Sequence, residues 1–233
     1  MKMIIKVSDE KTLIRAISSH IEKLSNDAID SRGKFFIGLS GGSVIKYLSE
    51  ALPLMMTDFR KWTIAFCDER VVPEDSDDST FGMYKKEVIP KSLLKEEQFI
   101  KIKQGASAAE TAKDYTTKLT KAFESDNFIF DVLLLGIGPD GHTCSLFPNH
   151  KLLEEKVYKV AAITDSPKPP PHRITLTFPV INAARNCIFA VCGEGKADIV
   201  KRILKDNEDL PANRVNPEGC LYWIVDNSAA VHL

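Results

Sequence analysis

The chain has 233 residues, of which 44% are hydrophobic and 27% charged, and its formal net charge at pH 7 is -1. This length suits one α/β domain, and the composition is that of an ordinary soluble globular protein. A nearly neutral chain lacks the basic surface that nucleic acids and anionic membranes require, so neither is an expected partner.

The chain begins with a short apolar run over 3–7 that meets charged residues at once and has no small-residue cleavage site behind it. We therefore expect a first strand there and no secretory signal. No apolar run in the sequence approaches membrane-spanning length. The five cysteines form no C-x-x-C pair and are predicted to be reduced thiols in a cytosolic protein.

Strand-like runs alternate with amphipathic segments along the rest of the chain. Ser8 and Asp9 can cap a helix that carries Leu13, Ile17 and Ile21 on one face. Further helices are predicted after the SGGS loop through 52, behind a capping box formed by Ser107 and Glu110, and over 196–204. Further strands are predicted over 34–39, 62–66, 131–135, 157–163, 173–178, 188–191 and 221–225.

This alternation predicts an α/β fold with a mostly parallel sheet flanked by helices on both faces. There is no repeat, low-complexity segment or linker, so one domain over 1–233 is expected. In such folds the loops at the carboxyl ends of the strands build the site. Polar or glycine-rich segments stand at such places: SGGS, CDER, GIGPDGHT and CGEGK.

The segment GIGPDGHT contains Gly136, Gly138 and Gly141 in the spacing of a dinucleotide-binding fingerprint. That fingerprint requires a helix directly behind the third glycine, and Pro148 would break such a helix within two turns. The dinucleotide interpretation is therefore rejected. The glycines instead let the backbone turn sharply and place Asp140 and His142 at the end of a strand.

Asp140 and His142 are two residues apart, so the carboxylate can fix the imidazole tautomer and leave the other ring nitrogen free as a base. Taken alone, the D-G-H motif is equally compatible with a capped turn beside a partly buried histidine. The two interpretations therefore stay open at this point.

Three segments are candidates for binding a phosphate. The loop Ser40, Gly41, Gly42 and Ser43 leads into a helix, whose first N–H groups together with the hydroxyls can form an anion nest. It lacks the Lys-Ser/Thr ending of a nucleoside-triphosphate loop. Arg173 and Lys196 lie in or near other strand-end loops and suit a phosphomonoester.

The segment CDERVVP places Asp68, Glu69 and Arg70 behind a fully apolar strand, which favours a position in the site. His142 and Cys144 are two residues apart, but no second cluster has the spacing of metal ligands. No metal and no cofactor is expected.

These segments together resemble the 6-phosphogluconolactonase family over essentially the whole chain, in its animal cytosolic form. The resemblance rests on several long motifs in the same order: GLSGGS, FCDERVVPEDSDDSTFGMY, LLLGIGPDGHTCSLFP, PKPPPHRITLTFPVINAA, CGEGKADIVKRIL and PANRV. It implies a fold shared with glucosamine-6-phosphate deaminases and ribose-5-phosphate isomerases. It also implies hydrolysis of 6-phospho-D-glucono-1,5-lactone in the oxidative pentose phosphate pathway.

The resemblance implies that His142 activates a water and that Asp140 orients it. The SGGS loop, Arg173 and Lys196 would hold the 6-phosphate, and Arg70 would bind either the phosphate or the developing oxyanion, which residue types do not decide. Further residues expected to line the site are Asp68, Glu69, Gly138, Gly141 and Thr143.

Two alternatives were weighed against the lactonase. In the related deaminases a glutamate follows the D-G-H motif and serves in ring opening, but the matching position here is Phe147, and D-E-Y is replaced by Asp68-Glu69-Arg70. A phosphosugar-binding protein without catalysis would not need the Asp140 and His142 pair. Oligomeric state, protein partners and the role of the acidic run 73–78 are not predicted.

Overall fold

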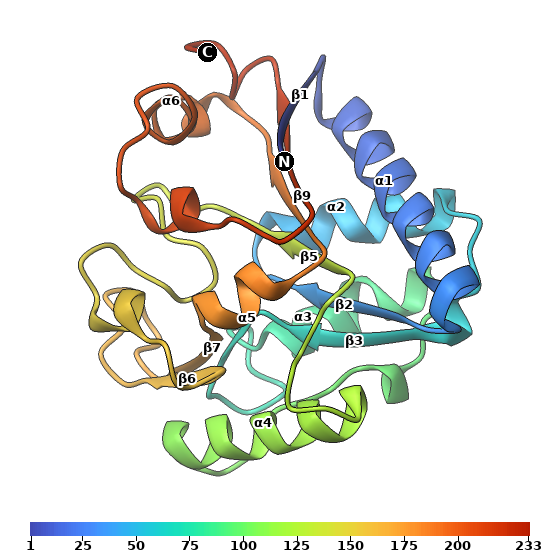
Figure 1. Cartoon of the computed structure of the whole chain (residues 1–233), viewed down its shortest axis with the longest axis vertical. Coiled ribbons are helices and arrows are strands. Elements are labelled where there is room, and N and C mark those ends of the chain that lie inside the picture. Colours follow the sequence, from blue (N-terminus) through green and yellow to red (C-terminus); the bar gives the residue numbers. More distant parts are fainter.

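The computed structural model describes all 233 residues and is built around a six-stranded parallel sheet (Figure 1). The strand order is β1-β9-β8-β5-β2-β3, and every neighbouring pair is parallel. This confirms the predicted fold class. The strands are β1 (Lys2–Val7), β2 (Phe35–Leu39), β3 (Trp62–Phe66), β5 (Val132–Leu135), β8 (Asn186–Val191) and β9 (Cys220–Asp226).

The helices begin at the caps that the sequence indicates. The Asp9 side chain accepts a hydrogen bond from the Thr12 N–H at 2.8 Å, and Ser107 and Glu110 form the expected capping box. The helices are α1 (Glu10–Arg32), α2 (Ser43–Ala51), α3 (Thr80–Glu87), α4 (Ala108–Phe123), α5 (Phe178–Ala183) and α6 (Ala197–Leu204).

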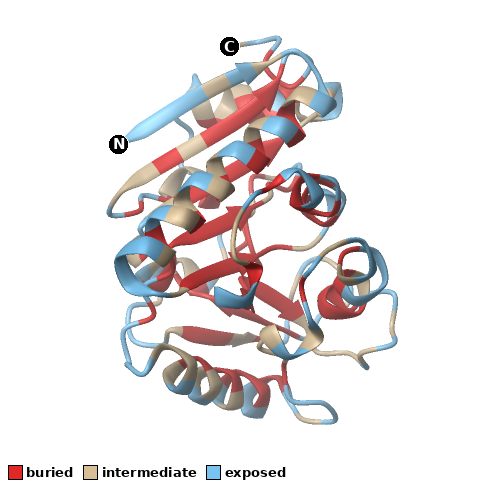
Figure 2. Cartoon of the chain, turned by 90° about the vertical axis from the view of Figure 1, so that its right-hand side faces the viewer, coloured by how far each residue is buried: buried red, intermediate tan, exposed pale blue.

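The large sheet separates two apolar cores, because successive side chains of a strand point to opposite faces. Val132 and Leu134 of β5 pack with α1, α2 and α3, whereas Leu133 and Leu135 pack with α4, α6 and the elements on the other face. All four side chains are fully buried. Figure 2 shows the buried strands between helices whose outer faces are exposed.

A second sheet of three antiparallel strands corrects one part of the prediction. It consists of β4 (Asp68–Arg70), β7 (Arg173–Leu176) and β6 (Val160–Ile163), in that order. The sequence predicts CDER as a loop and predicts one sheet only. A parallel crossover needs a dozen or more residues, and the segment between β6 and β7 is too short for one. Figure 1 shows α4 below this small sheet.

The bounds of β6 and β7 are shorter than predicted. Residues 157–159 precede β6, and Thr177 ends β7 by donating its hydroxyl to the Tyr158 carbonyl at 2.6 Å. The chain then enters α5 with Pro179 in its first turn, where the missing N–H of proline carries no penalty.

A buried carboxylate connects the starts of two neighbouring central strands, β2 and β5. Asp131 accepts hydrogen bonds from the Phe36 N–H at 2.8 Å and from Arg32 at 2.6 Å, and the Arg185 Nε lies 3.3 Å away. The Asp131 residue is only 4% exposed. Its loss would leave the buried Phe36 N–H without a partner.

We expect Asp131→Ala to lower the free energy of unfolding by about 2–3 kcal/mol, because it strands a buried donor and removes a charged acceptor. Urea denaturation followed by circular dichroism measures this. Asp209→Ala, which removes an exposed carboxylate paired with Arg214, should leave the midpoint almost unchanged. Equal midpoints for the two variants would contradict the role given to Asp131.

Candidate active site

A cavity of about 190 Å³ opens at the carboxyl ends of the central strands. It lies where the loops after β2, β5 and β8 meet the small sheet, because parallel neighbours end at the same edge. The cavity is lined by Ser40, Gly41, Gly42, Ser43, Asp68, Arg70, Gly136, Ile137, Gly138, His142, Cys144, Arg173 and Lys196. Most of the residues predicted for the site therefore come together here.

The loop after β5 presents an imidazole held by a carboxylate. His142 Nδ1 lies 2.5 Å from Asp140 Oδ1. With Nδ1–H donating to the carboxylate, Nε2 is the ring nitrogen left unprotonated, and it makes no hydrogen bond within the protein. The backbone turn is closed by the Gly138 N–H donating to the His142 carbonyl at 2.9 Å. This arrangement suits a general base.

Gly138 is required for this turn because the imidazole lies directly against its Cα. A Cβ at this position would meet the His142 ring at 2.0 Å and the Asp140 carboxylate at 2.7 Å. Gly141 has a φ of +84°, a conformation that L side chains rarely adopt. No helix directly follows Gly141, as the rejection of a dinucleotide fingerprint requires.

The pKa values of His142 and Asp140 are both lowered, but for different reasons. Burial lowers the pKa of His142, and this outweighs the hydrogen bond and the charge of Asp140, which act to raise it. Partial burial acts to raise the pKa of Asp140, but the hydrogen bond and charge of His142 outweigh it, so that this pKa is lowered. At neutral pH the pair is therefore a neutral imidazole and a carboxylate.

The opposite wall of the cavity has the features of an anion site. The Ser40 hydroxyl is buried and has no hydrogen-bond partner. Gly42, with a φ of +69°, turns the backbone so that α2 begins at Ser43 and presents its first N–H groups. Lys196 lines the same cavity and donates to the Ile137 carbonyl at 2.7 Å. An oxyanion could satisfy the orphaned hydroxyl and the free N–H groups together.

Arg173 lines the cavity, but most of its N–H groups hold the proline-rich segment. Nε donates to the Pro170 carbonyl, and Nη2 donates to the carbonyls of Lys168 and Pro169, each at 3.0 Å. Nη1 lies 3.4 Å from the Ser145 hydroxyl. Burial lowers the pKa of Arg173, with the nearby Arg70 charge as the next cause. Only part of this guanidinium can therefore face a ligand.

Arg70 and Asp68 extend from the small sheet into the cavity. Arg70 lies on the rim and donates from Nη1 to the Asp78 carbonyl at 2.8 Å. This contact connects it to the acidic run. Asp68 is buried and accepts a hydrogen bond from the Ser145 hydroxyl at 2.6 Å.

Four predicted site residues lie outside the cavity lining: Asp140, which contacts it only through His142, and Glu69, Gly141 and Thr143. Glu69 points into the protein, where it accepts hydrogen bonds from the Thr80 and Phe81 N–H groups at 2.8 Å and thus fixes the start of α3. Burial raises the pKa of Glu69 to about 7. Gly141 packs against Leu210, and the Thr143 hydroxyl donates to the Gly136 carbonyl at 3.0 Å.

The sequence gives no indication of Lys168 or Ser145, and it suggests Cys144 only as a metal ligand beside His142. Lys168 contacts both members of the D-G-H pair, but it follows them by more than twenty residues and no spacing signals the contact. Cys144 lines the cavity, and its pKa is raised first by the hydrogen bond with Cys67 and then by burial.

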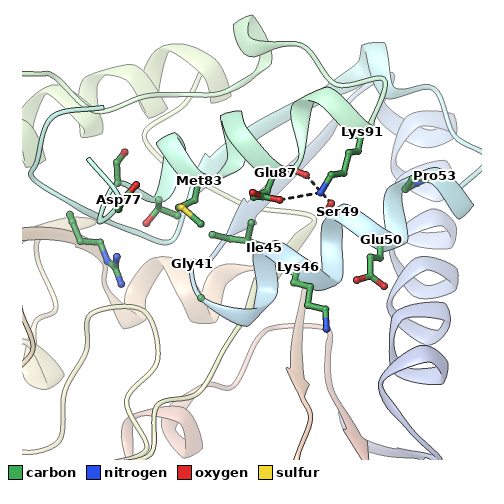
Figure 3. A pocket seen from close by; sticks show the side chains of 14 residues that line it. Gly41, Ile45, Lys46, Ser49, Glu50, Pro53, Asp77, Met83, Glu87 and Lys91 are labelled. Carbon is green, nitrogen blue, oxygen red and sulfur yellow. Dashed lines mark hydrogen bonds and ion pairs between the residues drawn. The ribbon is translucent and has the colours of Figure 1, made fainter. Parts of the chain in front are cut away.

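A larger hollow of about 780 Å³ adjoins the cavity between α2 and α3 (Figure 3). Its two lysines are already paired with carboxylates: Lys91 pairs with Glu87 at 3.0 Å, and Lys46 pairs with Glu10. It contains no histidine. The smaller cavity is therefore the candidate active site.

No group of three or more His, Cys, Asp or Glu side chains converges as a metal site would require. None of the helices has the length and apolar character needed to cross a membrane.

The fold and the cavity define an α/β protein that presents a carboxylate-held imidazole beside an anion-binding loop. The chain belongs to the glucosamine-6-phosphate isomerase/6-phosphogluconolactonase family, whose sequence model matches residues 8–223. It is 49% identical to the human 6-phosphogluconolactonase over 209 residues, covering 86% of this chain and 81% of the relative. It is 41% identical over 230 residues to a probable 6-phosphogluconolactonase of Drosophila melanogaster, covering 97% and 93%.

Solved structures agree with the fold. A 6-phosphogluconolactonase from Trypanosoma cruzi superposes with a TM-score of 0.85 at 25% identity, covering 100% of this chain and 97% of the other. A monomeric glucosamine-6-phosphate deaminase superposes with a TM-score of 0.79 at 18% identity, covering 100% of both. The fold is thus shared by two chemistries, so the site must decide between them.

We expect the His142 imidazole to titrate below its ordinary value of about 6.5, because burial disfavours the charged ring. Nitrogen-15 NMR of the ring, assigned by its loss in His142→Asn, measures this pKa. A ring that is still protonated at pH 7 would exclude a general base at this position.

Proposed function

We propose that this chain hydrolyses 6-phospho-D-glucono-1,5-lactone to 6-phospho-D-gluconate, the second step of the oxidative pentose phosphate pathway. The observation that carries the proposal is the His142 Nε2, free of protein partners, in one cavity with an anion nest that contains an orphaned hydroxyl. The names of the curated relatives support the same substrate.

In the proposed complex the 6-phosphate lies on the SGGS loop and against Lys196. The Ser40 hydroxyl and the N–H groups at the start of α2 donate to its oxygens, and Lys196 supplies the compensating charge. Arg173 adds its remaining N–H and its charge. Anchoring this end of the substrate presents the ring carbonyl to the other wall of the cavity.

His142 then takes a proton from a water at Nε2 while the water oxygen attacks the lactone carbonyl carbon. The tetrahedral intermediate collapses by breaking the bond between that carbon and the ring oxygen. The imidazolium returns its proton to the ring oxygen, which leaves as the 5-hydroxyl, and the new acid releases a proton to solvent. Asp140 stabilises the imidazolium through the Nδ1 hydrogen bond.

Arg70 is placed on the rim between the two hollows, with Nη1 held by the Asp78 carbonyl. We propose that its remaining N–H groups serve the substrate, either at the phosphate or at the oxyanion. A rise in KM alone for Arg70→Ala assigns the phosphate, and a fall in kcat alone assigns the oxyanion.

This chain lacks the acidic side chain that deaminase chemistry needs. Phe147 stands where the deaminase motif has a glutamate, and its ring packs against the His142 ring with centroids 4.8 Å apart. An apolar ring fully buried against the imidazole offers no group for proton transfer.

We further propose that residues 1–233 act as a single lactonase domain in the cytoplasm. The cavity is lined by residues from 40 to 196, and the strands of the main sheet that carries it extend from residue 2 to residue 226. Three of the five cysteines are buried thiols, which suits a reducing compartment.

Proton release from freshly prepared lactone, corrected for spontaneous hydrolysis, tests the activity directly. An ammonia-release assay with glucosamine 6-phosphate runs beside it. We expect fast lactone opening and no ammonia. Ammonia release, or tight phosphosugar binding without either reaction, would overturn the proposal.

We expect His142→Ala to lower kcat about 10²–10⁴-fold, the usual contribution of a general base, and to leave binding of 6-phosphogluconate largely intact. Stopped-flow kinetics and calorimetric titration measure the two quantities. Full turnover in this variant would exclude His142 as the base, and lost binding would place it at the phosphate.

We expect Gly138→Ala to reduce kcat at least tenfold, because the new methyl group occupies the position of the imidazole. Gly195→Ala is the matched control, since a Cβ there meets no atom within 4 Å. Both variants should keep the wild-type circular dichroism spectrum. Equal kcat values in Gly138→Ala and Gly195→Ala would contradict this expectation, because they would show that the loop can shift to accept the methyl group without loss of catalysis.

A further inference from the structure

Lys168 contacts the catalytic pair at the Nδ1 edge of the His142 imidazole. Its Nζ is 3.3 Å from Asp140 Oδ1 and 3.2 Å from His142 Nδ1. It is absent from the cavity lining. Since Nδ1–H already points to the carboxylate, the ammonium and the imidazole both donate to the same Asp140 oxygen. Lys168 is thus placed to act on the base and not on the substrate.

The backbone that carries Lys168 is fixed by several contacts. Its carbonyl accepts hydrogen bonds from the Ser166 hydroxyl at 2.8 Å and from Arg173 Nη2 at 3.0 Å. Its N–H donates to the Ser166 hydroxyl at 3.2 Å. Arg173 is itself buried within β7. The small sheet therefore fixes, through Arg173, the backbone from which the Lys168 side chain reaches the pair.

We propose that Lys168 is a positioning residue that shares the Asp140 carboxylate with His142, holding the imidazole in place and keeping Nε2 unprotonated and ready to accept the proton of water. This inference rests on the proposed function. A positive charge beside the ring disfavours the imidazolium, whereas a carboxylate alone would favour it. Lys168 offsets part of the Asp140 effect.

Other charges also face the imidazole and set the background of its titration. Asp140 lies on its own loop. Asp68 and Arg70 come from β4, Arg173 comes from β7, and Lys196 comes from the short helix after β8. Among these, Asp140 and Asp68 favour the charged ring, and Lys168 opposes it. Lys168 is the cation in direct contact with the Nδ1 edge.

The test compares Lys168→Met with Lys168→Arg and with Lys151→Met. Methionine keeps the length of the side chain without the charge, and arginine keeps the charge. Lys151 is exposed and pairs with Asp165 instead of Asp140, so its loss controls for a general change in net charge. Nitrogen-15 NMR of the His142 ring gives its pKa in each variant without any need for substrate.

We expect Lys168→Met to raise the His142 pKa by roughly 1 unit, which is the effect of removing a unit charge at this distance when it is screened as in bulk water. The acid limb of the kcat/KM profile should move by the same amount, with KM above the limb unchanged. Lys168→Arg should restore most of the shift, and Lys151→Met should show none.

An unchanged His142 pKa in Lys168→Met would overturn the proposal. So would an equal shift in the arginine variant, or a loss of rate that is the same at every pH. Should the wild-type chain fail to open the lactone, the ring titration would still report on Lys168. The failure of the proposed function is thereby separated from the failure of this inference.

Discussion

The hydrogen bond between Asp140 and His142 is the interaction on which the candidate active site depends, and much of the fold serves to hold it. The D-G-H turn lies at the carboxyl end of β5, a central strand whose four side chains are all buried. A turn at the end of such a strand is held in place, because apolar cores pack on both faces of the sheet. This gives the proposed base the preorganised position that catalysis requires.

The two walls of the cavity have different origins. The anion nest needs only the end of β2 and the start of α2, which are neighbours in sequence. The proposed base, by contrast, is contacted by Lys168 from the proline-rich segment. Arg173 of the small sheet holds this segment by donating hydrogen bonds to three successive carbonyls. In the proposed function the small sheet therefore supports the base through this segment, and its Arg70 and Arg173 also serve the substrate.

Local signals predicted most of the fold, and they also suggest the nest as a candidate anion site. Strand periodicity, the Asp9 cap and the Ser107 capping box each depend on a few adjacent residues, and each prediction was confirmed. The small sheet was missed because β4 has only three residues, and its pairing with β7 is a contact between distant segments. Lys168 and the inward turn of Glu69 were missed for the same reason: propensity and spacing do not encode how separate loops pack.

The hydrogen bonds of Arg173 also restrict which insertions and deletions the segment between β6 and β7 can tolerate in evolution. Surface loops usually tolerate inserted and deleted residues, because few of their backbone groups are engaged. In the segment between β6 and β7, the carbonyls of Lys168 and Pro169 both accept from the Arg173 guanidinium, and the Lys168 side chain contacts Asp140. Inserting or deleting one residue there would move these carbonyls away from the guanidinium and Lys168 away from Asp140. A loop that looks variable on the surface is thus as constrained in length as a strand in the core.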